Sequence, residues 1–145
     1  MTPETQILIR ESFAQVAPIA PRAAALFYGR LFVLDPSLKA LFNGDMEEQG
    51  RKLMAMLGSV VANLSKLETF LPAVRNLGRR HVAYGVQPEH YDIVGSALLW
   101  TLGQGLGEAF TPRVEAAWTE AYTILATAMR DAAAEPMRHA LNAAA

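Results

Sequence analysis

The sequence contains no cysteine, which excludes disulfide bonds, thiolate metal sites and cysteine nucleophiles. No uncharged apolar run reaches the roughly 18 residues that a membrane span needs. The polar start, Met1 to Gln6, lacks the basic and apolar regions of a signal peptide. A net charge of −1 gives no indication of nucleic acid or of an acidic membrane as a partner. These absences predict a soluble cytoplasmic protein.

Signals for β-strands are missing as well. The chain shows neither the alternation of apolar and polar residues typical of strands nor a hairpin signal between two such segments. Apolar residues recur instead at spacings of three and four throughout, which is the period of a helix with one buried face. At 145 residues the chain has the length of one domain. The fold class predicted from these patterns is all-α.

Caps and breakers divide the chain into six substantial helices and one short one. Thr2-Pro3 and Thr111-Pro112 each predict an N-cap followed by proline at the first helical position. Asp45, with Glu48 three residues later, fits a capping box. The expected ranges are about 3–16, 21–34, 36–42, 46–64, 72–84, 88–106 and 112–131, with a loop over 67–72. The Ala-rich residues 132–145 are expected to form a fraying, partly disordered tail after a domain spanning residues 1–131.

His81 is the histidine of greatest interest among the three in the chain. It follows Val74 and Leu77 at spacings of seven and four, so it lies on the apolar face of its helix. Neutral imidazole is a good ligand for iron, zinc or copper. Taken alone, a histidine in this setting is more often structural than metal-binding. His90 is interpreted as a surface residue at a helix start and His139 as part of the tail.

Gln49 and Tyr28 are polar side chains at positions that should face inward. Gln49 lies four residues before Leu53, on the apolar face of its helix and at its N-terminal end. Either it sits at the solvent margin of that face, or it points into a cavity. Tyr28 belongs to the apolar stripe of the second helix, and Phe42 lies in the corner between the two helices.

Together these stretches resemble the globin family over about residues 5 to 130. The likeness to neuroglobin and to the haem domain of flavohaemoglobins is carried by Leu31-Phe32, Asp35-Pro36, Leu41-Phe42, Arg51 to Met54, Leu77 to His81, Tyr84 to Val86, His90-Tyr91, Val94-Gly95, Ala117-Trp118 and Tyr122. The resemblance implies a globin fold of six to eight helices around a haem pocket, with haem b as cofactor.

The resemblance also implies roles for particular residues. His81 matches the proximal histidine that binds the haem iron, and Phe42 the phenylalanine that packs on the haem face. Tyr28 and Gln49 match the distal hydrogen-bonding pair of flavohaemoglobins, with Gln49 where neuroglobin has histidine, so a five-coordinate iron is expected. Lys52 and Arg80 stand where they can meet the haem propionates. The other residues implied to contact the haem are Leu53, Tyr84, Val86, Tyr91 and Val94.

Two departures from flavohaemoglobins bear on activity. The sequence holds no flavin or nicotinamide motif, whereas those proteins carry a reductase domain after the globin. They also place a glutamate in the last helix that polarises the proximal histidine through the tyrosine matched by Tyr91. That glutamate position falls at Ala133, and the nearby Glu135 is out of register, which leaves open whether Glu135 substitutes for it.

Two functions follow from the resemblance, and the sequence does not separate them. The first is reversible binding of dioxygen, carbon monoxide and nitric oxide for storage or transport. The second is a nitric oxide dioxygenase, with Tyr28 and Gln49 as catalytic residues and a separate reductase as partner. A gas sensor is a third, weaker alternative. The sequence also does not choose between a monomer and a weak homodimer.

Overall fold

The computed structural model describes the backbone of residues 1–144 and the side chains of residues 1–135. Within this range the chain forms six α-helices and four short 3₁₀ helices, and no strand. The α-helices are α1 (Pro3–Val16), α2 (Ala20–Leu34), α3 (Met46–Ala62), α4 (Leu67–Ala83), α5 (His90–Leu106) and α6 (Pro112–Ala144). The 3₁₀ helices are η1 (Ala17–Ile19), η2 (Pro36–Leu41), η3 (Leu64–Lys66) and η4 (Gly107–Ala109). The all-α class predicted from the sequence is confirmed.

The predicted caps form at several helix starts. The Thr2 hydroxyl accepts the backbone N–H of Thr5 at 3.1 Å, and Asp45 accepts that of Glu47 at 2.9 Å. Asp45 is therefore the N-cap of α3, as expected. In a capping box the Glu48 side chain would accept the backbone N–H of Asp45. Here the Glu48 carboxylate instead accepts two bonds from Arg51.

Two predicted helix limits are wrong. Residues 67–72 are the first part of α4 and not a loop, with Pro72 inside the helix. Phe70 packs on the core and Val74 is buried, and this packing outweighs the hydrogen bond that proline removes. The last helix also does not end near residue 131. It continues to Ala144, and Ala132 is completely buried although its neighbours predict no buried face. The disorder expected for the tail falls largely outside the residues whose side chains are described.

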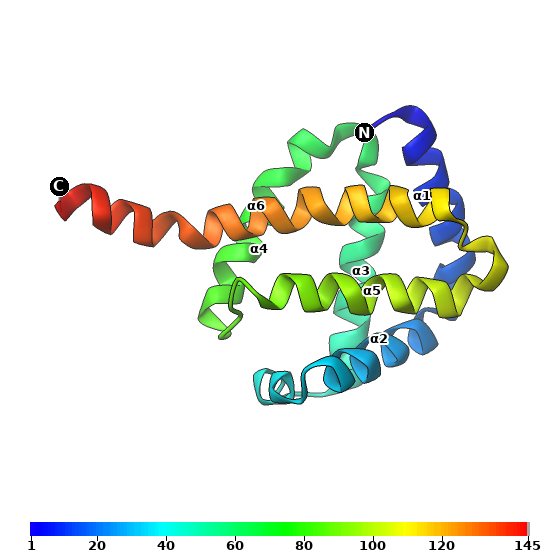
Figure 1. Cartoon of the computed structure of the whole chain (residues 1–145), viewed down its shortest axis with the longest axis horizontal. Helices are drawn as coiled ribbons and strands as arrows, with labels where there is room; N and C mark the ends of the chain where they lie inside the picture. Colours follow the sequence, from blue (N-terminus) through cyan, green and yellow to red (C-terminus); the bar gives the residue numbers. More distant parts are fainter. Residues whose placement is uncertain (145) are drawn as a thin grey trace.

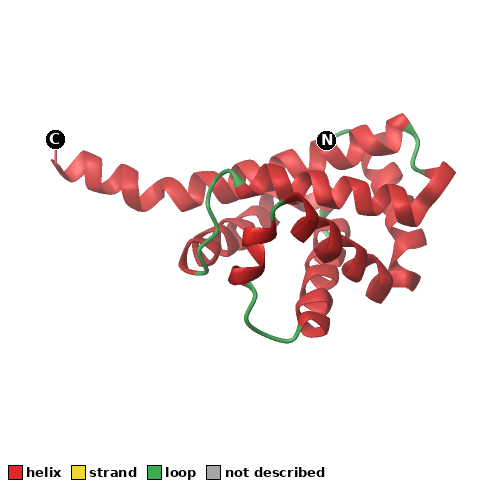
Figure 2. Cartoon of the chain, turned by 60° about the horizontal axis from the view of Figure 1, so that its bottom comes forward, coloured by secondary structure: helices red, strands yellow, loops and turns green. Residues whose placement is uncertain are grey.

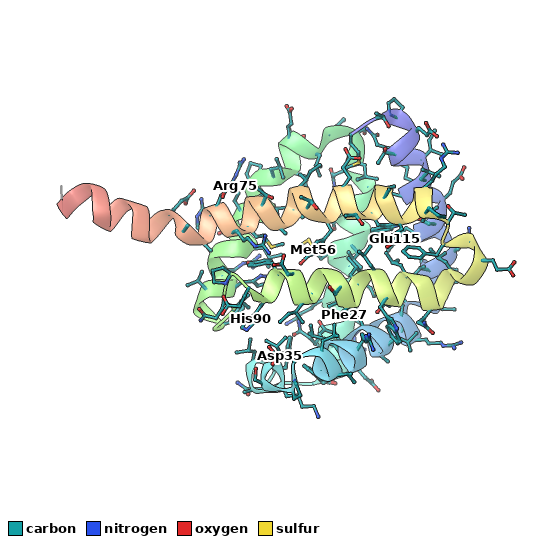
Figure 3. All side chains as sticks on the ribbon, in the orientation of Figure 1. Phe27, Asp35, Met56, Arg75, His90 and Glu115 are labelled. Carbon is teal, nitrogen blue, oxygen red and sulfur yellow. The ribbon has the colours of Figure 1, made fainter. Side chains whose placement is uncertain are left out.

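The helices cross in layers around one apolar core. Figure 1 shows α5 and α6 running alongside each other, with α3 crossing behind them and α2 lying beneath α5. The most extensive packing is between α4 and α6, followed by α2 with α5 and α2 with α3. The end of α6 projects beyond the body of the molecule in Figure 1. Phe27 and Met56 lie inside this body, whereas Arg75 and Glu115 are exposed (Figure 3).

Gly78 permits a close approach of α4 to α6. A Cβ atom on Gly78 of α4 would lie 2.6 Å from the backbone oxygen of Met129 on α6. Helix α3, by contrast, is not among the helices that pack extensively against α4. The two helices are therefore held apart, and a cavity occupies the space that they border. No helix within the described residues is both long and apolar enough to cross a membrane.

Candidate functional site

A cavity of about 710 Å³ opens between the helices, within the range typical of small-molecule sites. Two loops, residues 42–45 before α3 and residues 84–89 after α4, contribute to its lining and are drawn in green in Figure 2. The structure brings every site residue predicted from the sequence to this one cavity: Tyr28, Phe42, Gln49, Lys52, Leu53, Arg80, His81, Tyr84, Val86, Tyr91 and Val94.

Tyr28 is held on the α2 side of the cavity by other aromatic rings. Its ring meets Phe27 edge to face at 4.9 Å between centroids and Phe42 at 5.4 Å. Phe32 completes the cluster at 6.2 Å from Tyr28. Edge-to-face pairs at these separations are favourable, and Tyr28 is buried. The cluster therefore fixes the direction of a phenol that also lines the cavity.

The electrostatics of Tyr28 keep its hydroxyl protonated. Burial raises the pKa of the phenol, and the side-chain amide of Gln49 offsets part of that rise. Gln49 is half-buried in the first turn of α3, beside the loop that precedes the helix. Of the two readings that the sequence left open for Gln49, the structure favours the one in which it reaches the cavity. The two side chains offer O–H and N–H donors to a polar ligand.

His81 enters the cavity from α4. Burial lowers the pKa of its imidazole, and the positive charge of Arg80 lowers it further. The imidazole is therefore neutral near pH 7, which is the form that binds metals. Its Nδ1 atom is buried without a hydrogen-bond partner among the described residues. The same residues contain no group of three or more His, Cys, Asp or Glu side chains able to hold a metal ion.

The end of α4 is closed by a glycine turn next to His81. Gly85 has φ of +93°, the left-handed conformation that glycine adopts without steric cost. The N–H of Val86 donates to the His81 carbonyl at 3.0 Å, and the N–H of Gly85 donates to Val82 at 3.1 Å. These two bonds define a Schellman motif. The helix end predicted at Gly85 is confirmed, and the motif places Val86 beside His81 at the cavity.

Tyr91 and Tyr122 lie on the same side of the cavity as His81. Tyr91 is 5% exposed, and its ring centroid lies 6.4 Å from that of His81. Its hydroxyl has no partner among the described residues. The Tyr122 hydroxyl donates to the Tyr91 carbonyl at 2.5 Å, and burial strongly raises the Tyr122 pKa. The Tyr122 ring lies where a side chain on residue 95 would be. Because residue 95 is glycine, there is room for the ring.

Cations stand at the exposed edge of the cavity. Lys52 on α3 and Arg80 on α4 both line it and are exposed to solvent. Apolar walls, the neutral imidazole of His81 and two cations at the edge suit a largely apolar, metal-bearing prosthetic group with acidic substituents.

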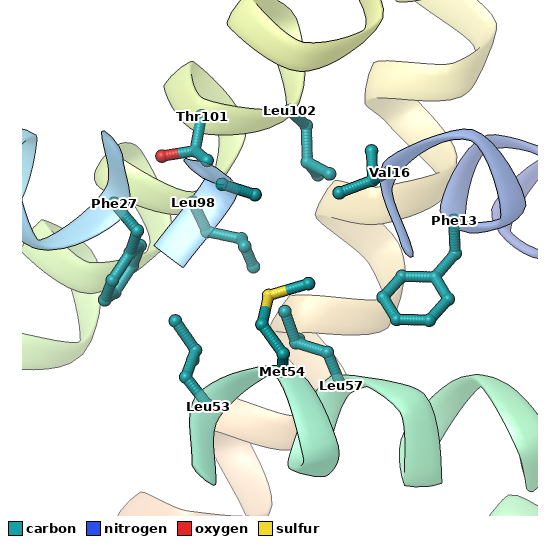
Figure 4. A pocket seen from close by; sticks show the side chains of 10 residues that line it. Phe13, Val16, Phe27, Leu53, Met54, Leu57, Leu98, Thr101 and Leu102 are labelled. Atoms are coloured by element: carbon teal, nitrogen blue, oxygen red, sulfur yellow. The ribbon is translucent and has the colours of Figure 1, made fainter. Parts of the chain in front are cut away.

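A second, far smaller cavity of about 10 Å³ adjoins the first. Figure 4 shows Leu53 and Leu57 facing Leu98 and Leu102 across it. The one polar group in its lining, the Thr101 hydroxyl, already donates to the Ala97 carbonyl at 2.8 Å. Leu53, Leu57, Leu98 and Phe27 line both cavities, so they form an apolar partition between them.

The structure refines one interpretation, answers one open question and adds residues. His90 lies at the start of α5, as interpreted, but it is half-buried, lines the cavity and accepts the N–H of Gln87 at 2.9 Å. Glu135 accepts two bonds from Arg79, so it does not take the position beside Tyr91.

Lining residues that the sequence did not single out as site residues include Met56, Val60, Val74, Leu77, Leu125 and Met129. Their helical spacing was visible, but it does not distinguish a cavity wall from a solid core.

Comparison with known proteins agrees with this geometry. The family model described as Globin matches residues 25–129. The chain is 35% identical to a flavohemoprotein of Rhodopirellula baltica over 129 residues, covering 87% of this chain and 32% of that protein. It is 34% identical to a flavohemoprotein of Vibrio cholerae over 134 residues, covering 90% of this chain and 34% of that protein. The chain thus spans about a third of the length of these curated relatives.

Proposed function

Because this chain belongs to the globin family, we propose that it is a gas-binding haemoprotein that holds haem b in its large cavity, with His81 as the iron ligand. The observation that carries the proposal is the meeting of His81, Tyr28 and Gln49 at one cavity of about 710 Å³. Haem supplies an iron that binds diatomic gases reversibly in its ferrous form. The side chains around the haem would hold it in place and form hydrogen bonds with the bound gas.

Each side chain has a distinct task in this proposal. Phe42 and Leu53 offer apolar surface to the porphyrin, and Lys52 and Arg80 offer cations to its propionates. Tyr28 and Gln49 donate hydrogen bonds to a polarised diatomic ligand, and such bonds are stronger in a low-dielectric cavity than in water. No histidine lies on the α3 wall of the cavity, which supports an iron with one protein ligand.

The His81 assignment is tested by removing the imidazole. His81→Gly should lose most of its haem, because the iron would have no protein ligand. Haem content and the absorption spectrum of the reduced protein measure this loss. Free imidazole should restore a five-coordinate ferrous spectrum to His81→Gly. His139→Ala is the matched control, because the sequence places this histidine in the tail, and it should keep its haem.

Unchanged haem content and spectrum in His81→Gly would overturn the assignment. A low-spin spectrum with two histidine ligands in the reduced, gas-free protein would contradict the proposed open coordination position.

Nitric oxide dioxygenation is a second candidate, supported by the matched flavohemoproteins and by the Tyr28–Gln49 pair. That reaction converts nitric oxide, dioxygen and one electron to nitrate, and a separate reductase would supply the electron. The test is nitric oxide consumption by the oxygenated protein with a generic flavin reductase and NADH. Sustained turnover that Tyr28→Phe abolishes would favour this function, whereas a single stoichiometric reaction would favour gas binding alone.

A further inference from the structure

Arg130 on α6 carries a positive charge that the proposed function does not use. Its guanidinium packs against the start of α5, the end that His90 marks in Figure 3. Nε donates to the Pro88 carbonyl at 3.3 Å, and Nη2 donates to the Asp92 carboxylate at 2.6 Å. Its central carbon, Cζ, lies 5.4 Å from the ring centroid of Tyr91. These contacts hold the cation against the ring of Tyr91.

The ring of Tyr91 lies near both this charge and His81. The buried ring of Tyr91 is 6.4 Å from that of His81, and neither the Tyr91 hydroxyl nor His81 Nδ1 has a partner among the described residues. The two centroid distances limit the gap from Arg130 Cζ to the imidazole to about 12 Å. An interior with few dipoles transmits a charge over this range better than water does.

The positive potential of Arg130 reaches both tyrosines on this side of the cavity. Burial raises the pKa of Tyr91 and of Tyr122, and Arg130 lowers both. Asp92 is the counterion, but its side chain is 84% exposed, against 35% for Arg130. Water therefore screens the carboxylate more than the guanidinium, and a net positive potential remains on the protein side.

We propose that Arg130 tunes the oxidation state of the iron site: its fixed charge, transmitted past Tyr91, favours ferrous over ferric haem. This inference rests on the proposed haem function and deepens it. A ferric centre carries one more positive charge than a ferrous centre, so a nearby cation destabilises the ferric form. The consequence is a site held in the oxidation state that binds gases.

The size of the effect follows from the distance. A unit charge about 12 Å away at an effective dielectric constant of about 20 changes an equilibrium constant by up to roughly tenfold. Partial compensation by Asp92 reduces this, so a threefold to tenfold change in the ferrous-to-ferric ratio is expected. For a one-electron couple a tenfold change is about 59 mV.

The test is the midpoint potential of the haem-loaded protein, measured by spectroelectrochemistry in low salt. Arg130→Met should lower the potential, and Arg130→Lys should restore most of it because the charge is kept. Asp92→Asn should move the potential upward, because the counterion is lost. Arg113→Met is the matched control, since Arg113 is an exposed arginine at the far end of the same helix, paired with Glu4. Its potential should be that of the unmodified chain.

The outcomes separate this inference from the function on which it rests. Failure of the unmodified chain to bind haem would overturn both. Normal haem binding with equal potentials in Arg130→Met and the unmodified chain would overturn the tuning role alone. If Arg130→Met does not fold, Asp92→Asn still decides, because an unchanged or lower potential in that variant contradicts a charge effect.

Discussion

At the scale of residues, the two polar donors in the cavity, Tyr28 and Gln49, differ in how firmly their surroundings hold them. Tyr28 is fixed within a cluster of aromatic rings on α2, whereas Gln49 lies in the first turn of α3, next to a loop. A donor held by its surroundings loses less entropy when it binds a ligand than one that must first be ordered. Tyr28 is therefore expected to retain a gas ligand more strongly than Gln49.

Tyr28→Phe should accordingly speed dioxygen dissociation more than Gln49→Ala does. Loss of one neutral hydrogen bond corresponds to about 0.5–1.5 kcal/mol, or roughly threefold to tenfold in affinity. Carbon monoxide, which is less polarised when bound, should be affected less. Stopped-flow displacement on both variants measures this. Equal changes for both gases, or none for dioxygen, would make Tyr28 a space-filling residue.

Individual site residues could be predicted from the sequence where a helical face determined their direction. Tyr28, Gln49 and His81 all fell on inward faces, and all three line the cavity. The place of His90 in the cavity lining was missed, because a residue at a helix start has no established face. The contact of Arg130 with Tyr91 joins α6 to the start of α5. That contact depends on how the two helices cross, which periodicity within either helix does not specify.

At the scale of elements, the crossing of α4 and α6 depends on Gly78. A Cβ atom there would approach the Met129 backbone to within 2.6 to 3.0 Å, and backbone cannot turn aside as a flexible side chain can. Gly29 on α2 has open space around the same position. The two glycines thus form a matched pair, one required by packing and the other replaceable.

Gly78→Ala should lower the free energy of unfolding by about 1–3 kcal/mol, because α4 must move away from α6. Gly29→Ala should raise it by roughly 0.5–1 kcal/mol, since alanine favours a helix interior over glycine. Urea unfolding of both variants, followed by circular dichroism, gives the two values. A neutral Gly78→Ala would mean that the helix contact yields easily.

The limits of α4 and α6 show what local patterns omit. Pro72 predicts a break, yet the packing of Phe70 and Val74 keeps residues 67–72 helical. Alanines after residue 131 predict no buried face, but Ala132 is completely buried in α6, the helix that packs most extensively against α4. The loop predicted over residues 67–72 and the helix end predicted near residue 131 were both wrong for one reason. Packing against other parts of the fold stabilises these helical segments, and local sequence patterns do not report it.

At the scale of the whole molecule, the cavity makes part of the fold dependent on its occupant. Within α4, the buried residues are Val74 and Gly78, and the face that carries Val74, Leu77 and His81 borders the cavity. Helices α2 and α5, in contrast, contribute many residues to the apolar core. Local stability follows buried apolar contact. Helix α4 should therefore be the α-helix most affected when the cofactor is removed.

Removal of haem should lower the melting temperature and speed amide exchange most in α4. Haem at a hundredfold excess over its dissociation constant contributes about 2.7 kcal/mol. In a chain of this size that corresponds to a shift of roughly 5–10 °C. Differential scanning calorimetry and hydrogen–deuterium exchange, each with and without haem, measure the two effects. Uniform protection across α2, α4 and α5 in the haem-free protein would contradict the expected order.

The glycine turn that ends α4 has a consequence for hydration. Carbonyl groups at a helix end commonly attract water, because no later N–H group of the helix reaches them. Here the carbonyls of Arg80, His81 and Val82 all accept N–H groups from residues 84–86. These carbonyls around His81 are thus already bonded within the protein, and a water molecule approaching the imidazole finds fewer unpaired backbone acceptors there. The closed turn should slow hydration of the bond between His81 and the iron, and with it the loss of the cofactor to solvent.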